Sequence, residues 1–187
     1  MGQEDGGTVV NPFTHEKVAW KPIGPVVDEF LFYSRSKLDA YTCKGVIGNK
    51  DHLEARPAGD HTPWSTHSVV VDGRTVKPLR GWVYAIDGDL PDKAGFEEWL
   101  LRELRNGGYP HVKYFNILNR HWNRKSRARG VPFAKSRHSD DDHLHLSFMP
   151  GCERSNSSIL ADWERHRTGQ VHRPRDRRRP NVVRHVL

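Results

Sequence analysis

Cysteine is nearly absent from this chain, and its scarcity limits how the protein can be held together. The sequence has 187 residues and two cysteines, Cys43 and Cys152. Two cysteines are too few for a disulfide framework, and they form no CxxC pair of the kind that binds zinc through thiolates. Any bound metal would therefore be held by histidine and carboxylate side chains, and the chain contains 12 histidines.

Long apolar runs are also missing. No stretch approaches the roughly 20 apolar residues of a membrane-spanning helix, so we expect a soluble protein with no membrane span. The first ten residues, MGQEDGGTVV, carry acids and glycines where a secretion signal has a basic stretch and an apolar run, and no signal peptide is expected. The length suits one domain with a hydrophobic core and extended ends.

The positive charge is concentrated near the C-terminus. The chain has a net charge of +7, and residues 152–187 contain nine Lys/Arg against four Asp/Glu, which is +5 of that total. We expect these residues to form a basic, flexible tail that is available to contact a polyanion. No pattern in the sequence indicates an oligomeric state.

Between an extended N-terminal arm (1–24) and this tail, residues 25–151 have the patterns of an α+β domain. We expect a small, mostly antiparallel sheet with two or three packing helices, because apolar residues alternate in some segments and follow helical spacing in others. On the strand 111–118, Val112, Tyr114 and Asn116 should face one side, and Lys113 and Phe115 the other. The expected elements are a helix over 25–41, a hairpin over 68–76 that turns at Asp72-Gly73, a strand over 81–87, a helix over 92–106, and strands over 111–118 and 143–148. Asp92 can cap the helix over 92–106, whose apolar stripe includes Phe96 and Leu100. A polar, basic loop is expected over 119–130, and one short helix in SILADWERH.

Three places in this domain present metal-binding side chains. They are Asp60-His61 in the loop GDHTPWS, Asp87 at the end of the strand WVYAID, and His143 and His145, which alternate on the strand DHLHLS and so point to one side. Two imidazoles and a carboxylate make a tetrahedral zinc set whose fourth position is open to water. The spacing alone also suits ordinary turns and a solvated strand face.

Several segments resemble, in order, the M15 family of zinc peptidases, which comprises D-alanyl-D-alanine peptidases and phage endolysins. More specifically, these segments look like those of small phage and actinobacterial members whose core reads approximately DGxIGDxxH, SDHNP, GxVxAxDI, RIKYxI and HxxHxHxS. The corresponding text here is CKGVIGNKDH, AGDHTPWS, GWVYAID, HVKYFNIL and RHSDDDHLHLS, within residues 25–150. The residues that carry the pattern are His61, Gly81, Ala85, Asp87, His143, His145 and Ser147.

The resemblance implies a fold like that of Hedgehog domains and DD-peptidases, with one zinc ion bound by His61, Asp87 and His145. It leaves the general base open between Asp142, three residues before the last ligand, and His143, the first histidine of the His-x-His pair. Two features depart from the family. Here 25 residues, including the expected hairpin, separate the first two ligands, and SDDD separates His138 from His143.

Three further residues near the first ligand are candidates for substrate binding. Arg56 could pair with a substrate carboxylate through its planar guanidinium. Trp64 could provide a platform for substrate, and Ser65 could bind a substrate carbonyl. All three are also ordinary residues for a surface loop.

These observations favour a zinc peptidase that cleaves the stem peptides or cross-links of peptidoglycan, as a carboxypeptidase or an endopeptidase. Such an enzyme would be phage-encoded or made in the cytoplasm, and would act at the bacterial cell wall. The pI of about 9.6 and the segment RHWNRKSRARG keep a nucleic-acid-binding protein or metal-dependent nuclease as an alternative. A third hypothesis is a relative that has the same fold and binds zinc but has lost the hydrolytic activity.

Overall fold

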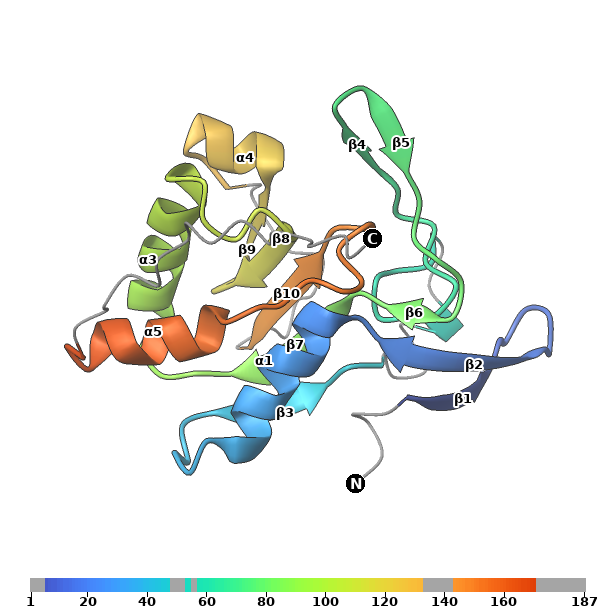
Figure 1. The fold of residues 1–187 in the computed structure, drawn as a ribbon, viewed down its shortest axis with the longest axis horizontal. Helices are drawn as coiled ribbons and strands as arrows, with labels where there is room; N and C mark the ends of the chain where they lie inside the picture. Colours follow the sequence, from blue (N-terminus) through green and yellow to red (C-terminus); the bar gives the residue numbers. More distant parts are fainter. Residues whose placement is uncertain (1–5, 48–52, 55–56, 133–142, 171–187) are drawn as a thin grey trace, which may run out of the picture.

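A five-stranded sheet lies at the centre of the computed structural model, which describes residues 6–47, 53–54, 57–132 and 143–170 (Figure 1). All neighbouring strands in this sheet are antiparallel. The α+β class expected from the sequence is therefore confirmed. In spatial order the strands are β3 (Thr42–Gly45), β7 (Ala85–Asp89), β10 (Leu144–Phe148), β8 (Val112–Ile117) and β9 (Arg120–Asn123).

The two faces of this sheet have different chemistry, because side chains alternate along each strand. One face is apolar, and residues such as Ile86, Leu146 and Phe115 pack there with side chains from α1 (Gly24–Arg35), α3 (Lys93–Arg105) and α5 (Ile159–Arg167). The opposite face carries mainly polar side chains. Those that bear on function are Asp87, His145, Ser147, Tyr114, Asn116 and His121.

Helix α3 matches its sequence prediction closely. Asp92 caps its start by accepting a hydrogen bond from the backbone N–H of Gly95, at 3.0 Å. The predicted apolar stripe, including Phe96 and Leu100, is buried in the core. Gly107, with a φ of 79°, follows the helix in the left-handed region that glycine adopts readily.

Helix α1 is shorter than the predicted helix over 25–41. It ends at Arg35, and Ser36 has an extended backbone. The Ser36 hydroxyl accepts a hydrogen bond from the backbone N–H of Leu38, at 3.3 Å, which competes with continued helix. Leu38 is exposed and Tyr41 is buried, so the apolar residues after Arg35 do not form one helical face.

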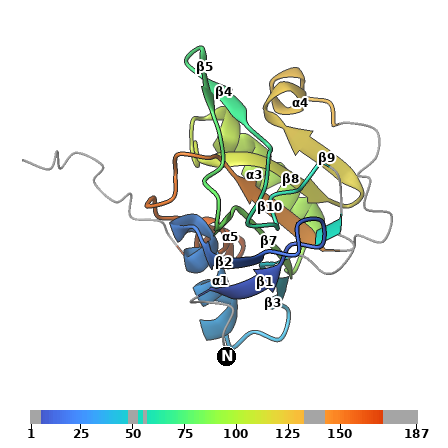
Figure 2. The same cartoon turned by 90° about the vertical axis from the view of Figure 1, so that its right-hand side faces the viewer.

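The hairpin is confirmed: β4 (Val69–Val71) and β5 (Arg74–Val76) are joined by Asp72 and Gly73, whose φ angles are 48° and 75°. Positive φ at both positions is characteristic of the type I′ turn that the Asp-Gly pair predicts. The hairpin projects from the rest of the fold in both views (Figure 1, Figure 2). It therefore extends the chain between the first two predicted ligands without separating them in space.

The strand predicted over 81–87 is two strands in two sheets. β6 (Trp82–Val83) and β7 are separated at Tyr84, whose backbone N–H donates to the carbonyl oxygen of Asp60, at 2.9 Å. The segment 119–130, read from the sequence as a polar loop, forms β9 and helix α4 (Arg124–Arg129), which begins with a capping box at Asn123.

The N-terminal segment is part of the fold, contrary to the extended arm expected over 1–24. β1 (Gly7–Val10) and β2 (Lys17–Pro22) form an antiparallel hairpin, and β2 pairs in parallel with β6. Burying Trp20 and Ile23 in the core stabilises this arrangement. The third strand of this sheet, β6, comes from residues far along the chain.

The domain also continues past the expected boundary at residue 151. Helix α5 buries Ile159, Leu160 and Trp163, and the Trp163 ring packs edge-on against Phe96 of α3 with 5.6 Å between ring centroids. The prediction of a flexible basic tail over 152–187 is therefore wrong for the described residues of that segment, although a short helix in SILADWERH was expected. Residues 171–187 lie outside the described residues. None of the helices among the described residues has the length and apolar character needed to cross a bilayer.

Candidate metal centre

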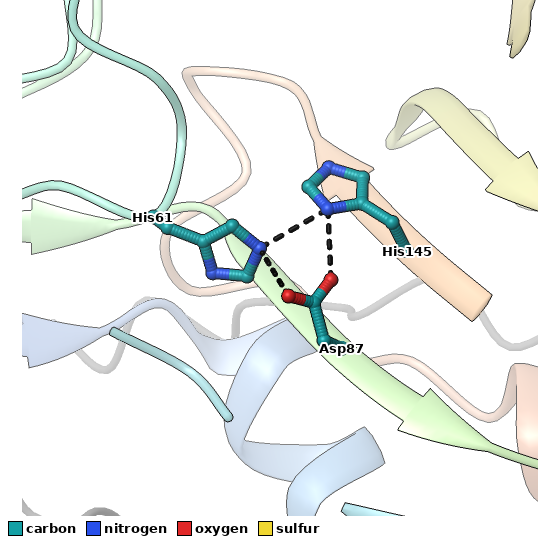
Figure 3. Close-up of side chains that lie close together, drawn as sticks. All are labelled: His61, Asp87 and His145. Atoms are coloured by element: carbon teal, nitrogen blue, oxygen red, sulfur yellow. Dashed lines mark hydrogen bonds and ion pairs between the residues drawn. The ribbon is translucent and has the colours of Figure 1, made fainter. Parts of the chain in front are cut away.

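Three side chains that are distant in the sequence meet on the polar face of the central sheet (Figure 3). His61 extends from the loop before β4, and its Nε2 lies 3.1 Å from Asp87 Oδ2 and 3.1 Å from His145 Nδ1. The same nitrogen of His145 lies 2.8 Å from Asp87 Oδ1. The ligand atoms of the three residues all lie within 4.8 Å of one another, close enough to hold one metal ion.

The register of the sheet brings two of these residues together. Asp87 of β7 and His145 of β10 are direct partners across an antiparallel pair. Side chains at such positions point to the same face with Cβ atoms about 5 Å apart. A shift of one residue in either strand would turn one of the two side chains into the apolar core. The alternation of buried leucines and polar residues in LHLS therefore specifies this contact.

A backbone carbonyl determines which nitrogen of His61 faces the centre as a ligand. His61 Nδ1 lies 2.6 Å from the carbonyl oxygen of Val46, and because a carbonyl only accepts, Nδ1 carries a hydrogen and donates it. In the neutral ring Nε2 then has a lone pair, which points at the carboxylate of Asp87. Two acceptors at 3.1 Å repel each other unless a cation lies between them. The cation can be a proton or a metal ion, and the donor set fits a metal ion.

The distances also fit a small divalent ion. Tetrahedral zinc with bonds of about 2.0–2.1 Å to nitrogen and oxygen places its ligand atoms about 3.4 Å apart. Here the corresponding atoms are 2.8–3.1 Å apart. Small rotations of the three side chains would therefore admit the ion. Two imidazoles and one carboxylate form a set that zinc accepts well.

The charges in the centre follow from burial and from these contacts. Burial raises the pKa of Asp87, but the neighbouring His61 and His145 lower it more, so the pKa lies far below its usual range. Burial lowers the pKa of His61, and the Asp87 carboxylate outweighs this effect and raises it. For His145 burial prevails, and its pKa is lowered. The centre thus combines an ionised carboxylate, one imidazole that tends to hold a proton, and one neutral imidazole.

The three side chains of the centre differ in their exposure. The side chains of His61 and His145 are 3% and 5% exposed, whereas that of Asp87 is 16% exposed. The side chain of His143 is 20% exposed, and its Nε2 atom lies 3.6 Å from Asp87 Oδ1. A fourth ligand such as water could therefore approach next to His143.

Polar side chains continue across the sheet beyond the three residues of the candidate centre. His145, Asn116 and His121 are successive cross-strand partners on β10, β8 and β9. His121 Nδ1 lies 2.7 Å from Asn116 Oδ1, and the Tyr114 ring stacks on His145 with 5.2 Å between centroids. His121 was not among the predicted site residues, because residues 119–130 were expected to form a loop. Its place beside the centre becomes visible only from the pairing of Asn116 on β8 with His121 on β9.

The residues predicted to bind substrate have mixed outcomes. The Ser65 hydroxyl donates to Asp60 Oδ1, at 3.0 Å, so in the structure it braces the loop that carries His61. Trp64 is partly buried in the same loop, and its contact with substrate stays a prediction. Arg56 and the alternative base Asp142 lie outside the described residues.

Comparison with known proteins finds no family model, no curated protein and no solved structure that matches this chain. The resemblance to M15 peptidases, and the Hedgehog-like fold that it implies, therefore stay predictions from the sequence motifs. The geometry of His61, Asp87 and His145 is the observation from which a function can be argued.

Proposed function

We propose that this protein is a zinc-dependent peptidase that cleaves the peptides of peptidoglycan. The observation that carries the proposal is the convergence of His61 Nε2, an Asp87 carboxylate oxygen and His145 Nδ1 within hydrogen-bonding distance of one another. The Val46 carbonyl supports it, because it presents the lone pair of His61 to the centre. The partial exposure of Asp87 leaves one side for water and substrate.

When bound, zinc would act as a Lewis acid that polarises the scissile carbonyl and makes an attacking water more acidic. His61 and His145 would hold the ion as neutral ligands, and Asp87 would offset part of its charge. Their burial would exclude bulk water from two sides and strengthen the electrostatic interactions within the centre.

His143 is the described residue best placed to move the proton. Its Nε2 lies beside Asp87 and its side chain is 20% exposed, so it would take a proton from the attacking water and deliver it to the leaving amine. In this reaction the amide C–N bond breaks, the water oxygen bonds to the carbonyl carbon, and the amine nitrogen gains a proton. Asp142 is the other predicted base, and β10 begins after it, at Leu144.

The substrate class comes from the resemblance to M15 peptidases, and the geometry supports the wider class of amide hydrolysis. Cell-wall peptides would place the protein's action at the bacterial wall, whether it is encoded by a phage or by a bacterium. The polar row from His145 to His121 offers hydrogen-bonding groups along which a peptide could lie.

The test is digestion of purified muropeptides by the zinc-loaded protein, followed by mass spectrometry. Cleavage should require zinc, stop when a chelator is added, and be lost in His61→Ala and His145→Ala. A matched control is His15→Ala, since His15 lies in the turn between β1 and β2. Stoichiometric zinc with no cleavage of any wall preparation would reject the peptidase and leave a zinc-binding protein. Metal-dependent cleavage of DNA with no cleavage of muropeptides would favour a nuclease.

A further inference from the structure

A β-bulge places a lysine next to the loop that carries His61. Ser147 of β10 pairs with Tyr114 of β8, but the next residue, Phe148, pairs with Val112. Lys113 is therefore the extra residue of a bulge and has no partner in the ladder. Such an insertion turns a side chain away from the face that simple alternation gives it. The sequence prediction that Lys113 faces away from Tyr114 is wrong for this reason, and Val112 instead enters the core.

From this position Lys113 holds the loop at two points. Its Nζ lies 2.8 Å and 3.0 Å from the two carboxylate oxygens of Asp60, and 3.0 Å from the carbonyl oxygen of His67. Asp60 immediately precedes the ligand His61, so the ammonium group bridges the two ends of the segment that presents this ligand. The side chains of Lys113 and Asp60 are 11% and 1% exposed, which shields their ion pair from solvent screening.

Asp60 also connects the loop to the strands that carry the other two ligands. Its carboxylate accepts a hydrogen bond from the hydroxyl of Ser147, two residues after His145 on β10. Its backbone carbonyl accepts from the N–H of Tyr84, which directly precedes β7 and hence Asp87. Asp60 is thus bonded to β8 and β10 through its buried carboxylate, and to the segment leading into β7 through its backbone carbonyl.

We infer that the Lys113–Asp60 ion pair is a positioning element that sets the metal affinity of the centre by fixing His61 relative to Asp87 and His145. The inference deepens the proposed function and rests on its metal site, but not on which bond the protein cleaves. Removing groups that orient metal ligands typically weakens metal binding 10- to 100-fold. We expect an effect of this size when Lys113 loses its charge.

The experiment is a competition titration of zinc against a chromophoric chelator, using the metal-free full-length protein. Lys113→Met should raise the Kd for zinc about 10- to 100-fold, and Lys113→Arg should restore most of the affinity. Lys93→Met is the matched control, since Lys93 forms an ion pair with Asp89 on the protein surface, at 3.2 Å, and should leave the Kd within about twofold.

A spectroscopic measurement separates positioning from general stability. In ¹⁵N spectra recorded at a pH where the His61 ring is neutral, metal-free wild type should show His61 with hydrogen on Nδ1, as its bond to Val46 requires. The Lys113→Met variant should show a mixture of tautomers. An unchanged Kd and an unchanged tautomer in folded Lys113→Met would overturn the inference.

A milder variant keeps the test decisive if Lys113→Met does not fold. Ser147→Ala removes one hydrogen bond to Asp60 and leaves the ion pair, so it should raise the Kd for zinc about two- to fivefold. A Kd identical to that of wild type would then contradict the inference. Failure of wild type to bind zinc would remove the proposed function and the inference together, whereas tight zinc binding that is insensitive to both residues would remove the inference alone.

Discussion

The stability of this protein should depend on pH through one buried carboxyl group, that of Glu29 on α1. Glu29 is 1% exposed and accepts hydrogen bonds from the backbone N–H groups of Ile159 and Leu160, at 2.7 Å and 3.0 Å. It also accepts from the hydroxyl of Ser157. Glu29 thus caps the start of α5, the helix that the sequence analysis placed outside the domain.

The direction of the effect follows from the pKa of this group. Burial outweighs the hydrogen bonds and raises the pKa of Glu29 from 4.5 to about 7. The folded state therefore binds this proton more tightly than the unfolded state, and the contribution to stability is fully present below pH 4.5. It decreases as the pH rises to about 7 and is constant above that. Since one pKa unit corresponds to about 1.4 kcal/mol, the loss amounts to roughly 3 kcal/mol.

Denaturant unfolding of wild type and Glu29→Gln between pH 4.5 and 8 would measure this contribution. The glutamine is neutral throughout, so its free energy of unfolding relative to wild type should rise by roughly 3 kcal/mol over this range. Glu98→Gln is the control, because Glu98 is exposed on α3 and its replacement should change stability by about 0.5 kcal/mol or less. A difference between Glu29→Gln and wild type that is the same at every pH would refute the reasoning.

Three further predictions concern the metal centre and the sheet. Removing zinc with a chelator should lower the melting temperature in calorimetry, because zinc at 100 times its Kd stabilises the folded state by about 2.7 kcal/mol, and His61→Ala should lose this response. His143→Ala should lower kcat about 100- to 10,000-fold in muropeptide cleavage while zinc stays bound; loss of zinc would instead identify His143 as a ligand. Gly88→Ala should reduce stability to urea by about 1–3 kcal/mol, because its Cβ would lie 2.3 Å from the Tyr33 ring. Gly59→Ala, with no atom within 4 Å of its Cβ, is the control, and equal losses would contradict the packing argument.

Local sequence patterns were sufficient to predict those segments whose conformation is determined by neighbouring residues. The Asp72-Gly73 turn was predictable because these residues tolerate the positive φ angles that a tight hairpin needs. Helix α3 was predictable from its cap and its apolar stripe. The helix over 25–41 was extended too far because Tyr41, which is buried, reaches the core from beyond the helix end.

The three residues of the candidate metal centre were identified from the order of several short motifs, and the structure brings these residues together. The motifs identify the two histidines and the carboxylate. Alternation along the strand then predicts that His145 lies on the polar face. The distance between His61 and Asp87 along the chain could not show whether they meet. Their contact depends on the hairpin projecting away from the fold and on the bonds that fix Asp60.

By itself, the sequence determined the fold class, the principal hairpin and helix α3, because these depend on alternation, helical spacing and turn chemistry within short segments. The tertiary structure alone decided that the N-terminal hairpin and α5 belong to the domain, since each is stabilised by residues distant in the chain. It also decided the tautomer of His61, through the Val46 carbonyl, and the position of Lys113, through a bulge. A bulge is defined by the pairing of two strands, so no pattern within either strand reveals it.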